Sequence, residues 1–136
     1  MLTYGSLYAG NGGIDLGFDR AGLKCRWQVE IDSHANRVLD RNFPGVWRHR
    51  DVRSFPPSHS NEWEVDVVAG GFPCQDISWA GHGVGLGGAR SGLFVEMLRI
   101  VRLLRPAYVL MENVAALLVR GIGVILGQLQ GVLQWG

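Results

Sequence analysis

The chain has 136 residues, of which 47% are hydrophobic and 18% are charged, a composition typical of one globular domain with a single core. Its formal net charge of +1 neither indicates nor excludes a nucleic-acid partner, because a basic face can exist on a nearly neutral protein. No apolar run approaches the roughly 18 residues of a membrane span, and the N-terminal sequence MLTYGSLYAG lacks the order of a signal peptide, so we expect a cytoplasmic protein without a membrane partner.

The first half of the chain alternates between strand and helix patterns. The apolar run TYGSLYA (3–9) predicts a buried strand, and after the turn GNGG the spacing of apolar residues predicts a helix over 14–21. A second strand is expected over 24–30. It precedes a helix over 34–43, for which Ser33 is the expected N-cap.

The second half continues the alternation. A short third strand is expected within 46–55, ending at HRDV, and a fourth over 65–71. A glycine-rich loop then precedes a helix over 91–104 and a fifth strand over 107–113. The helical pattern in 121–136 is interrupted by glycines. The whole pattern predicts an α/β fold with a parallel sheet and helices on both faces.

The carboxyl ends of the predicted strands carry glycines and polar residues, and ligands of parallel α/β sheets bind outside these ends. The loop AGNGG would bring bare backbone N–H groups to a helix N-terminus. Glu30 ends the second strand about 20 residues past Gly10, the spacing at which an acid commonly binds ribose hydroxyls. The remaining strands are followed by Asp51, Cys74, Glu112 and Asn113. Together these residues favour an adenosine-containing cofactor.

The glycine loop does not by itself identify that cofactor. A dinucleotide fingerprint would need a third glycine where Asp15 stands, so NAD is disfavoured but stays open. A P-loop is excluded because its glycine-lysine motif does not occur. The two cysteines form no C-x-x-C pair, so neither a disulfide framework nor a zinc site is indicated, and we expect no metal.

The sequence GGFPCQDIS places Cys74 directly after Pro73, on a loop at the expected ligand edge. A lone cysteine is commonly an inert buried side chain. A nucleophilic role would need a local field or a protonation partner, because a free thiol is only a few per cent ionised at pH 7. His82 is close in sequence, but nothing in the pattern orients it, so cysteine-protease chemistry is disfavoured.

Six segments, in this order and spacing, resemble the N-terminal two-thirds of the catalytic domain of DNA cytosine-C5 methyltransferases: LYAGNGGIDLGFDRAG, VEIDSHANRVL, RDV, AGGFPCQDIS, RSGLFVEMLRIVR and MENV. The glycine loop followed by PCQ and then ENV is highly specific. The resemblance implies a Rossmann-like S-adenosylmethionine-dependent methyltransferase fold, with residues 1–136 forming a single, partial catalytic domain that is truncated after about the fifth strand.

The resemblance implies that S-adenosylmethionine lies across the strand ends. Tyr8 would lie against adenine in place of the family's usual phenylalanine, and Glu30 would hold the ribose. Ile31 stands where many members carry a tryptophan and would cover the second adenine face. The other implied contacts are Gly10, Asn11, Gly12 and Gly13 for the methionine part, Asp51 and Val52 at the adenine edge, and Gly71 and Leu93.

The resemblance also implies the chemistry. The Cys74 thiolate would add to C6 of a cytosine flipped out of DNA, and Glu112 would hydrogen-bond or protonate N3 of the ring. Pro73 would pack beside the base, while Asn113 and Val114 would shape the loop that holds Glu112. The loop 75–88 would close on DNA. Its candidate DNA contacts are Gln75 and Ser78.

The sequence also departs from the family. The glutamine and paired arginines expected after ENV, the target recognition domain and the C-terminal segment have no counterpart in 115–136. The target DNA sequence is therefore unreadable, and a complementing C-terminal fragment or a second copy is the expected partner. The family implies a restriction-modification or phage-type enzyme in the bacterial cytoplasm. A tRNA cytosine-C5 methyltransferase and a non-catalytic cofactor- or partner-binding remnant stay open.

Overall fold

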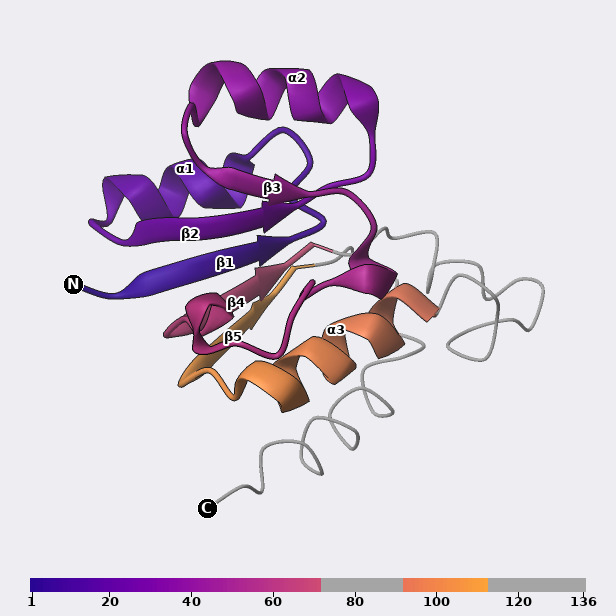
Figure 1. Cartoon of the computed structure of the whole chain (residues 1–136). Coiled ribbons are helices and arrows are strands. Elements are labelled where there is room, and N and C mark those ends of the chain that lie inside the picture. The colour runs from indigo at the N-terminus through magenta and orange to yellow at the C-terminus, as the bar shows by residue number, and fades with distance from the viewer. Residues whose placement is uncertain (72–91, 113–136) are drawn as a thin grey trace, which may run out of the picture.

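Parallel strands form one sheet in the computed structural model, which describes residues 1–71 and 92–112 (Figure 1). The strands are β1 (Thr3–Leu7), β2 (Lys24–Val29), β3 (Trp47–His49), β4 (Val67–Gly70) and β5 (Tyr108–Met111). Their order is β3-β2-β1-β4-β5, and each neighbouring pair is parallel. This order is that of a doubly wound sheet, whose winding reverses between β1 and β4. The predicted α/β fold with a parallel sheet is confirmed.

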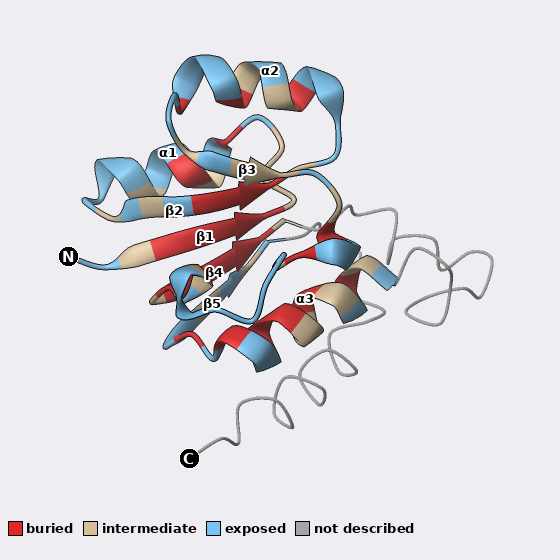
Figure 2. Ribbon diagram, viewed as in Figure 1, coloured by how far each residue is buried: buried red, intermediate tan, exposed pale blue. Residues whose placement is uncertain are grey.

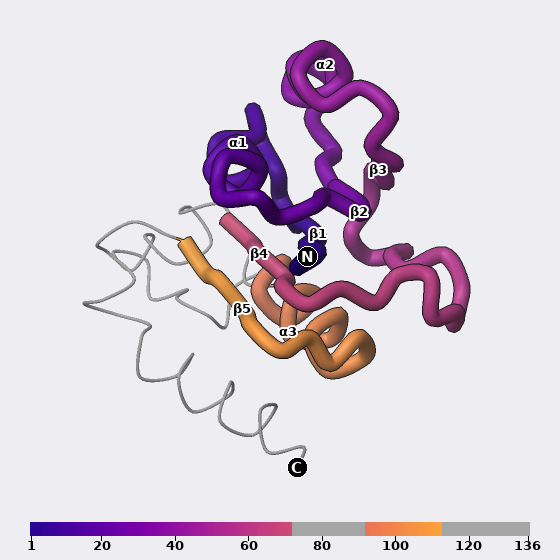
Figure 3. The backbone as a smooth tube through the Cα atoms, turned by 90° about the vertical axis from the view of Figure 1, so that its left-hand side faces the viewer, coloured from indigo at the N-terminus to yellow at the C-terminus, as the bar shows by residue number. Residues whose placement is uncertain are grey.

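Helices cover both faces of this sheet, as predicted. Figure 3 shows α1 (Gly13–Arg20) and α2 (Ser33–Asn42) on one face and α3 (Gly92–Leu104) on the other. Two short 3-10 helices, η1 (Val52–Ser54) and η2 (Asn61–Trp63), lie between β3 and β4 in the sequence. The glycine-rich loop, Cys74 and the helical pattern in 121–136 lie outside the described residues.

The predicted cap of α2 is wrong by one residue. Asp32, not Ser33, is the N-cap, and its carboxylate accepts a hydrogen bond from the Ala35 N–H at 2.8 Å. Asp32 has the extended backbone that a cap needs, whereas Ser33 is the first helical residue and its hydroxyl accepts from Arg50 at 3.0 Å. The third strand is also shorter than expected, because the chain turns into η1 directly after Asp51.

The apolar core lies between the sheet and α3 (Figure 2). Met97, Ile100 and Leu104 of α3 are buried there, whereas Leu93 is only half-buried at the edge of the core. The indole of Trp27 lies across Gly5, where an added Cβ would come within 2.1 Å of the ring. Gly5 therefore makes room for the largest side chain of the core.

The opposite face of the sheet holds a buried polar network centred on Asp15, in the first turn of α1. Its carboxylate is fully buried and accepts hydrogen bonds from Ser6 Oγ at 3.2 Å and Gln28 Nε2 at 2.9 Å. The Tyr4 hydroxyl donates to the Asp15 carbonyl oxygen at 3.1 Å, and Arg48 donates to Gln28 Oε1 at 2.9 Å. Burial raises the pKa of Asp15 in spite of the hydrogen bonds that lower it. These bonds fix the start of α1 on β1 and β2.

Replacing Asp15 by alanine should lower the free energy of unfolding by about 1–3 kcal/mol, because the Ser6 and Gln28 donors lose a buried acceptor.

The variant Asp15→Asn tests the pH dependence, because it removes the ionisable group and keeps one acceptor oxygen. The raised pKa means that the native state holds the Asp15 proton more tightly than the unfolded chain does, so the stability from this group falls as pH rises from 3.8 through the raised value. Urea unfolding of wild type and Asp15→Asn is therefore compared from about pH 4 to 8. As the pH rises, the free energy of unfolding of the variant should increase relative to that of wild type. A difference that does not vary with pH would contradict this account.

Candidate ligand-binding site

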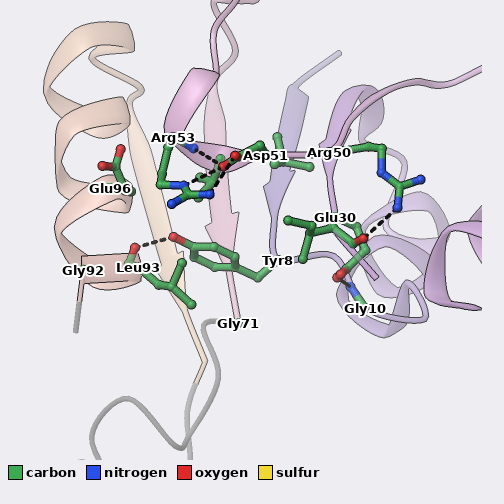
Figure 4. A pocket seen from close by; sticks show the side chains of 13 residues that line it. Tyr8, Gly10, Glu30, Arg50, Asp51, Arg53, Gly71, Gly92, Leu93 and Glu96 are labelled. Atoms are coloured by element: carbon green, nitrogen blue, oxygen red, sulfur yellow. Dashed lines mark hydrogen bonds and ion pairs between the residues drawn. The ribbon is translucent and has the colours of Figure 1, made fainter. Parts of the chain in front are cut away.

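A cavity of about 470 Å³ opens at the carboxyl ends of the central strands, beside the start of α3 (Figure 4). Its size is that of a small-molecule site, and it lies where the winding of the sheet reverses. Most of the residues expected to bind a cofactor line it: Tyr8, Gly10, Glu30, Ile31, Asp51, Val52, Gly71 and Leu93. Val29, Arg50, Arg53, Gly92 and Glu96 line it without having been predicted.

The carboxylate of Glu30 is held at the cavity by two loops. Its Oε1 accepts from the Gly10 N–H at 2.7 Å, and its Oε2 accepts from the Asp32 N–H at 2.8 Å. Each carboxylate oxygen has a second lone pair, so both oxygens can still accept a hydrogen bond from a ligand. The spacing of Gly10 and Glu30 in the sequence thus corresponds to a direct contact.

The glycine loop has two different surfaces. Gly10, with a φ of +58°, lines the cavity, whereas Gly12, with a φ of +87°, faces α2. A Cβ added to Gly12 would come within 2.6 Å of the Phe43 ring and 3.0 Å of Leu39. Asn11, Gly12 and Gly13 are not among the residues that line the cavity. Their contact with a cofactor stays a prediction.

Tyr8 links the end of β1 to the first turn of α3. It follows β1 with a left-handed backbone, at a φ of 55°, and its ring lies in the cavity (Figure 4). The Tyr8 hydroxyl donates a hydrogen bond to the Leu93 carbonyl oxygen in the first turn of α3. A phenylalanine could not make this bond, so the tyrosine adds a link between β1 and α3.

Asp51 stands at the end of β3 and caps η1. Its Oδ1 accepts from the Arg53 N–H and from Arg53 Nε, each at 3.0 Å, and its Oδ2 accepts from Arg53 Nη2 at 3.0 Å. These bonds hold the pKa of the Asp51 carboxyl below its usual range. Arg99 on α3 donates to the carbonyl oxygens of Val52 at 2.9 Å and Phe55 at 2.8 Å, which ties η1 to the helix.

Glu112 follows β5 at the same edge of the sheet. Its N–H donates to the Gly70 carbonyl oxygen at 3.1 Å, and its side chain is exposed. A Cβ added to Gly71 would lie 3.1 Å from Glu112 Oε2, so the carboxylate lies directly beside a residue of the cavity wall. The other predicted catalytic and DNA-contacting residues lie outside the described residues: Pro73, Cys74, Gln75, Ser78, Asn113 and Val114.

The missed residues differ in how well the sequence signals them. Arg50 and Arg53 flank Asp51 in the sequence, so their presence at the same strand end could have been inferred. Gly92 and Glu96 come from α3, and no local pattern says which turn of that helix reaches the cavity. Within residues 1–71 and 92–112, no cluster of metal-ligating side chains is found, and no helix is long and apolar enough to cross a membrane.

Comparisons with known proteins agree with this geometry. The model of the family described as C-5 cytosine-specific DNA methylase matches residues 2–130. The chain is 40% identical to the type II methyltransferase M.Eco47II of Escherichia coli, over 98% of this chain and 32% of that protein. It is 38% identical to the type II methyltransferase M2.BsuMI of Bacillus subtilis, over 94% of this chain and 33% of that protein. The chain thus spans about a third of the length of these curated relatives.

Solved structures give the same picture. A prophage-encoded Escherichia coli protein assigned as a DNA modification methyltransferase superposes with a TM-score of 0.76 at 29% identity, over 97% of this chain and 37% of that one. A mutant of Spodoptera frugiperda DNMT2 superposes with a TM-score of 0.76 at 25% identity, over 97% of this chain and 41% of that one.

The packing of Gly12 yields a matched pair of variants. Gly12→Ala should lower the free energy of unfolding by about 1–3 kcal/mol, because a Cβ there meets Phe43 and Leu39 on a backbone with positive φ. Gly13→Ala should change it by no more than about 0.5 kcal/mol, since nothing lies within 4 Å of the added Cβ. Urea unfolding that finds equal effects for the two variants would show that Gly12 does not pack as described.

Proposed function

This chain belongs to the C-5 cytosine-specific DNA methylase family, and on that premise we propose that it binds S-adenosylmethionine and carries the nucleophile for methyl transfer to C5 of cytosine in DNA. The observation that carries the proposal is the cavity at the strand ends, which is lined by the carboxylate acceptors of Glu30 and Asp51 together with apolar residues. The names of the curated relatives support a restriction-modification context.

The cavity suits the adenosyl part of such a cofactor. Glu30 retains an acceptor position on each oxygen for the two ribose hydroxyls. Tyr8, Ile31 and Val52 all line the cavity, where Tyr8 and Ile31 would supply apolar surface for the two faces of a planar base and Val52 would lie at its edge. Asp51 offers a carboxylate at the edge of that base. When bound, S-adenosylmethionine supplies an electrophilic methyl group.

We assign the chemistry on the cytosine to Cys74 and Glu112. Cytosine C5 is too weak a nucleophile to be methylated directly, so the Cys74 thiolate forms a bond to C6 and makes C5 an enamine carbon. Glu112 donates a hydrogen bond or a proton to N3, which relieves the charge that this addition places on the ring. After C5 is methylated, a base removes the C5 proton, the bond from Cys74 to C6 breaks, and aromaticity returns.

Two observations support this assignment. The Glu112 carboxylate lies beside Gly71, on the wall of the cavity. Cys74 follows Gly71 by three residues in the sequence. Glu112 therefore lies at the same edge of the sheet as the proposed cofactor site, and Cys74 is close to a residue of that edge in the sequence. Transfer to a cytosine of tRNA would use the same residues, so the choice between DNA and tRNA must be tested on both substrates.

Glu30→Ala should weaken the binding of S-adenosylmethionine by about 1.5–3 kcal/mol, the usual range for hydrogen bonds to a charged group. Isothermal titration calorimetry of the purified chain measures this loss. Glu62→Ala is the matched control, because Glu62 is an exposed acid of η2 and does not line the cavity. Unchanged affinity in Glu30→Ala would remove Glu30 from the cofactor site.

The covalent step predicts a trapped complex. With S-adenosylmethionine and a C-terminal part from a relative supplied separately, oligonucleotides containing 5-fluorocytosine should form an adduct that withstands denaturing electrophoresis, because fluorine at C5 cannot leave as a proton does. Cys74→Ser should abolish the adduct. Cys25→Ser should not, because burial raises the pKa of Cys25 to about 12 and keeps that thiol protonated.

Parallel reactions with DNA and tRNA oligonucleotides identify the substrate. An adduct on DNA supports the proposed function, whereas trapping on tRNA alone would replace DNA as the substrate. An adduct that survives Cys74→Ser would refute the mechanism.

The 136 residues alone should not methylate DNA at a measurable rate. They correspond to about a third of the length of the curated relatives, and we expect the remaining two thirds to supply the few kcal/mol needed to flip a cytosine and to fix the register on DNA. Incubation with labelled S-adenosylmethionine and mixed-sequence DNA, with and without the separately supplied C-terminal part, tests this. Label that enters cytosine in the absence of that part would contradict the prediction.

A further inference from the structure

Arg53 holds the carboxylate of Asp51 through three hydrogen bonds. Its backbone N–H and its Nε both donate to Oδ1, and its Nη2 donates to Oδ2, each at 3.0 Å. Both side chains line the cavity, as Figure 4 shows. A bidentate arginine fixes the plane of a carboxylate as well as its position, which a lysine cannot do.

The count of acceptor positions then says what Asp51 can still bind. A carboxylate has about four such positions, two on each oxygen. Arg53 fills both positions on Oδ1 and one on Oδ2. One position, on Oδ2, is left for a single N–H donor from a ligand. A carbonyl oxygen of a ligand would be repelled there, because a carboxylate has no proton to donate.

The surrounding charges keep Asp51 an acceptor. Arg53 and, more weakly, His49 on β3 favour its ionised form, and the pKa of the Asp51 carboxyl is lowered accordingly. Glu96 on α3 interacts electrostatically with Arg53, but the pKa of Arg53 is raised mainly by its hydrogen bond to Asp51. The carboxylate of Glu96 accepts a hydrogen bond from Arg99 Nε at 2.7 Å. Among the residues that the structure describes, Arg53 is thus the donor that holds the Asp51 carboxylate.

We propose that Arg53 is a positioning residue that orients Asp51 to accept a hydrogen bond from the 6-amino group of adenine, and so makes the site selective for 6-amino over 6-oxo purines. The inference rests on the proposed function, because it requires an adenosyl ligand in this cavity. It adds to that function a residue that acts through Asp51. It also adds a preference for 6-amino over 6-oxo purines, which the binding of adenosine alone does not require.

The test compares two ligands that differ at this one group, S-adenosylhomocysteine and S-inosylhomocysteine, by calorimetry on wild type, Asp51→Ala, Arg53→Gln and the double variant. Wild type should prefer the adenosyl ligand by about tenfold or more, as expected when a carbonyl replaces the donor of a charge-assisted hydrogen bond. Asp51→Ala and Arg53→Gln should each lose most of this preference. The double variant should show no further loss, because Arg53 acts through Asp51.

Arg50→Gln is the matched control for loss of positive charge on the same wall. Arg50 donates to the Ile31 carbonyl oxygen and the Ser33 hydroxyl, each at 3.0 Å, so its variant should keep the adenosyl preference. A purely structural role of Arg53 would weaken both ligands equally and leave their ratio unchanged, and this result would overturn the inference. Wild type that binds neither ligand would instead refute the proposed function.

Discussion

The arrangement of this site depends on a buried carboxylate that does not itself line the cavity, that of Asp15. Asp15 has no exposed surface, and its side chain accepts hydrogen bonds from Ser6 of β1 and Gln28 of β2. These bonds set where α1 begins, and the glycine loop must close the short distance between β1 and that point. Gly10 thereby reaches Glu30, and Gly12 packs on α2. An ionisable group that is costly to bury is retained where its hydrogen bonds determine the geometry of the ligand edge.

The cavity wall is built from pairs in which one group orients another before a ligand arrives. Backbone N–H groups hold Glu30, Arg53 holds Asp51, and the Tyr8 hydroxyl bonds to the first turn of α3. Arg99 ties the same helix to η1. Side chains held in this way lose little further conformational freedom on binding. Less of the binding free energy is therefore offset by the cost of ordering the site. The wall therefore depends on α3 as well as on the strand ends.

Sequence reasoning located the edge of the sheet where the ligand cavity lies, because the carboxyl ends of parallel strands must share one edge. It could not assign partners within that edge. Asp32 and Ser33 are both good caps, and only the backbone conformation decides between them. The sequence also did not indicate that Gly12 packs against Phe43 and Leu39, because contacts between α2 and the loop join segments about 30 residues apart. The role of Arg53 likewise depends on side-chain geometry that spacing does not encode.

The central claim is that S-adenosylmethionine occupies the cavity at the carboxyl ends of the strands. Backbone amide chemical shifts, followed by NMR as S-adenosylmethionine is added to the isotope-labelled chain, test it most directly. The account predicts saturable shifts at Gly10, Ile31, Val52 and Gly71, and none at Lys24 and Asp66, which lie at or near the amino ends of β2 and β4. Saturable shifts centred on Lys24 and Asp66, or none at the cavity residues, would contradict it.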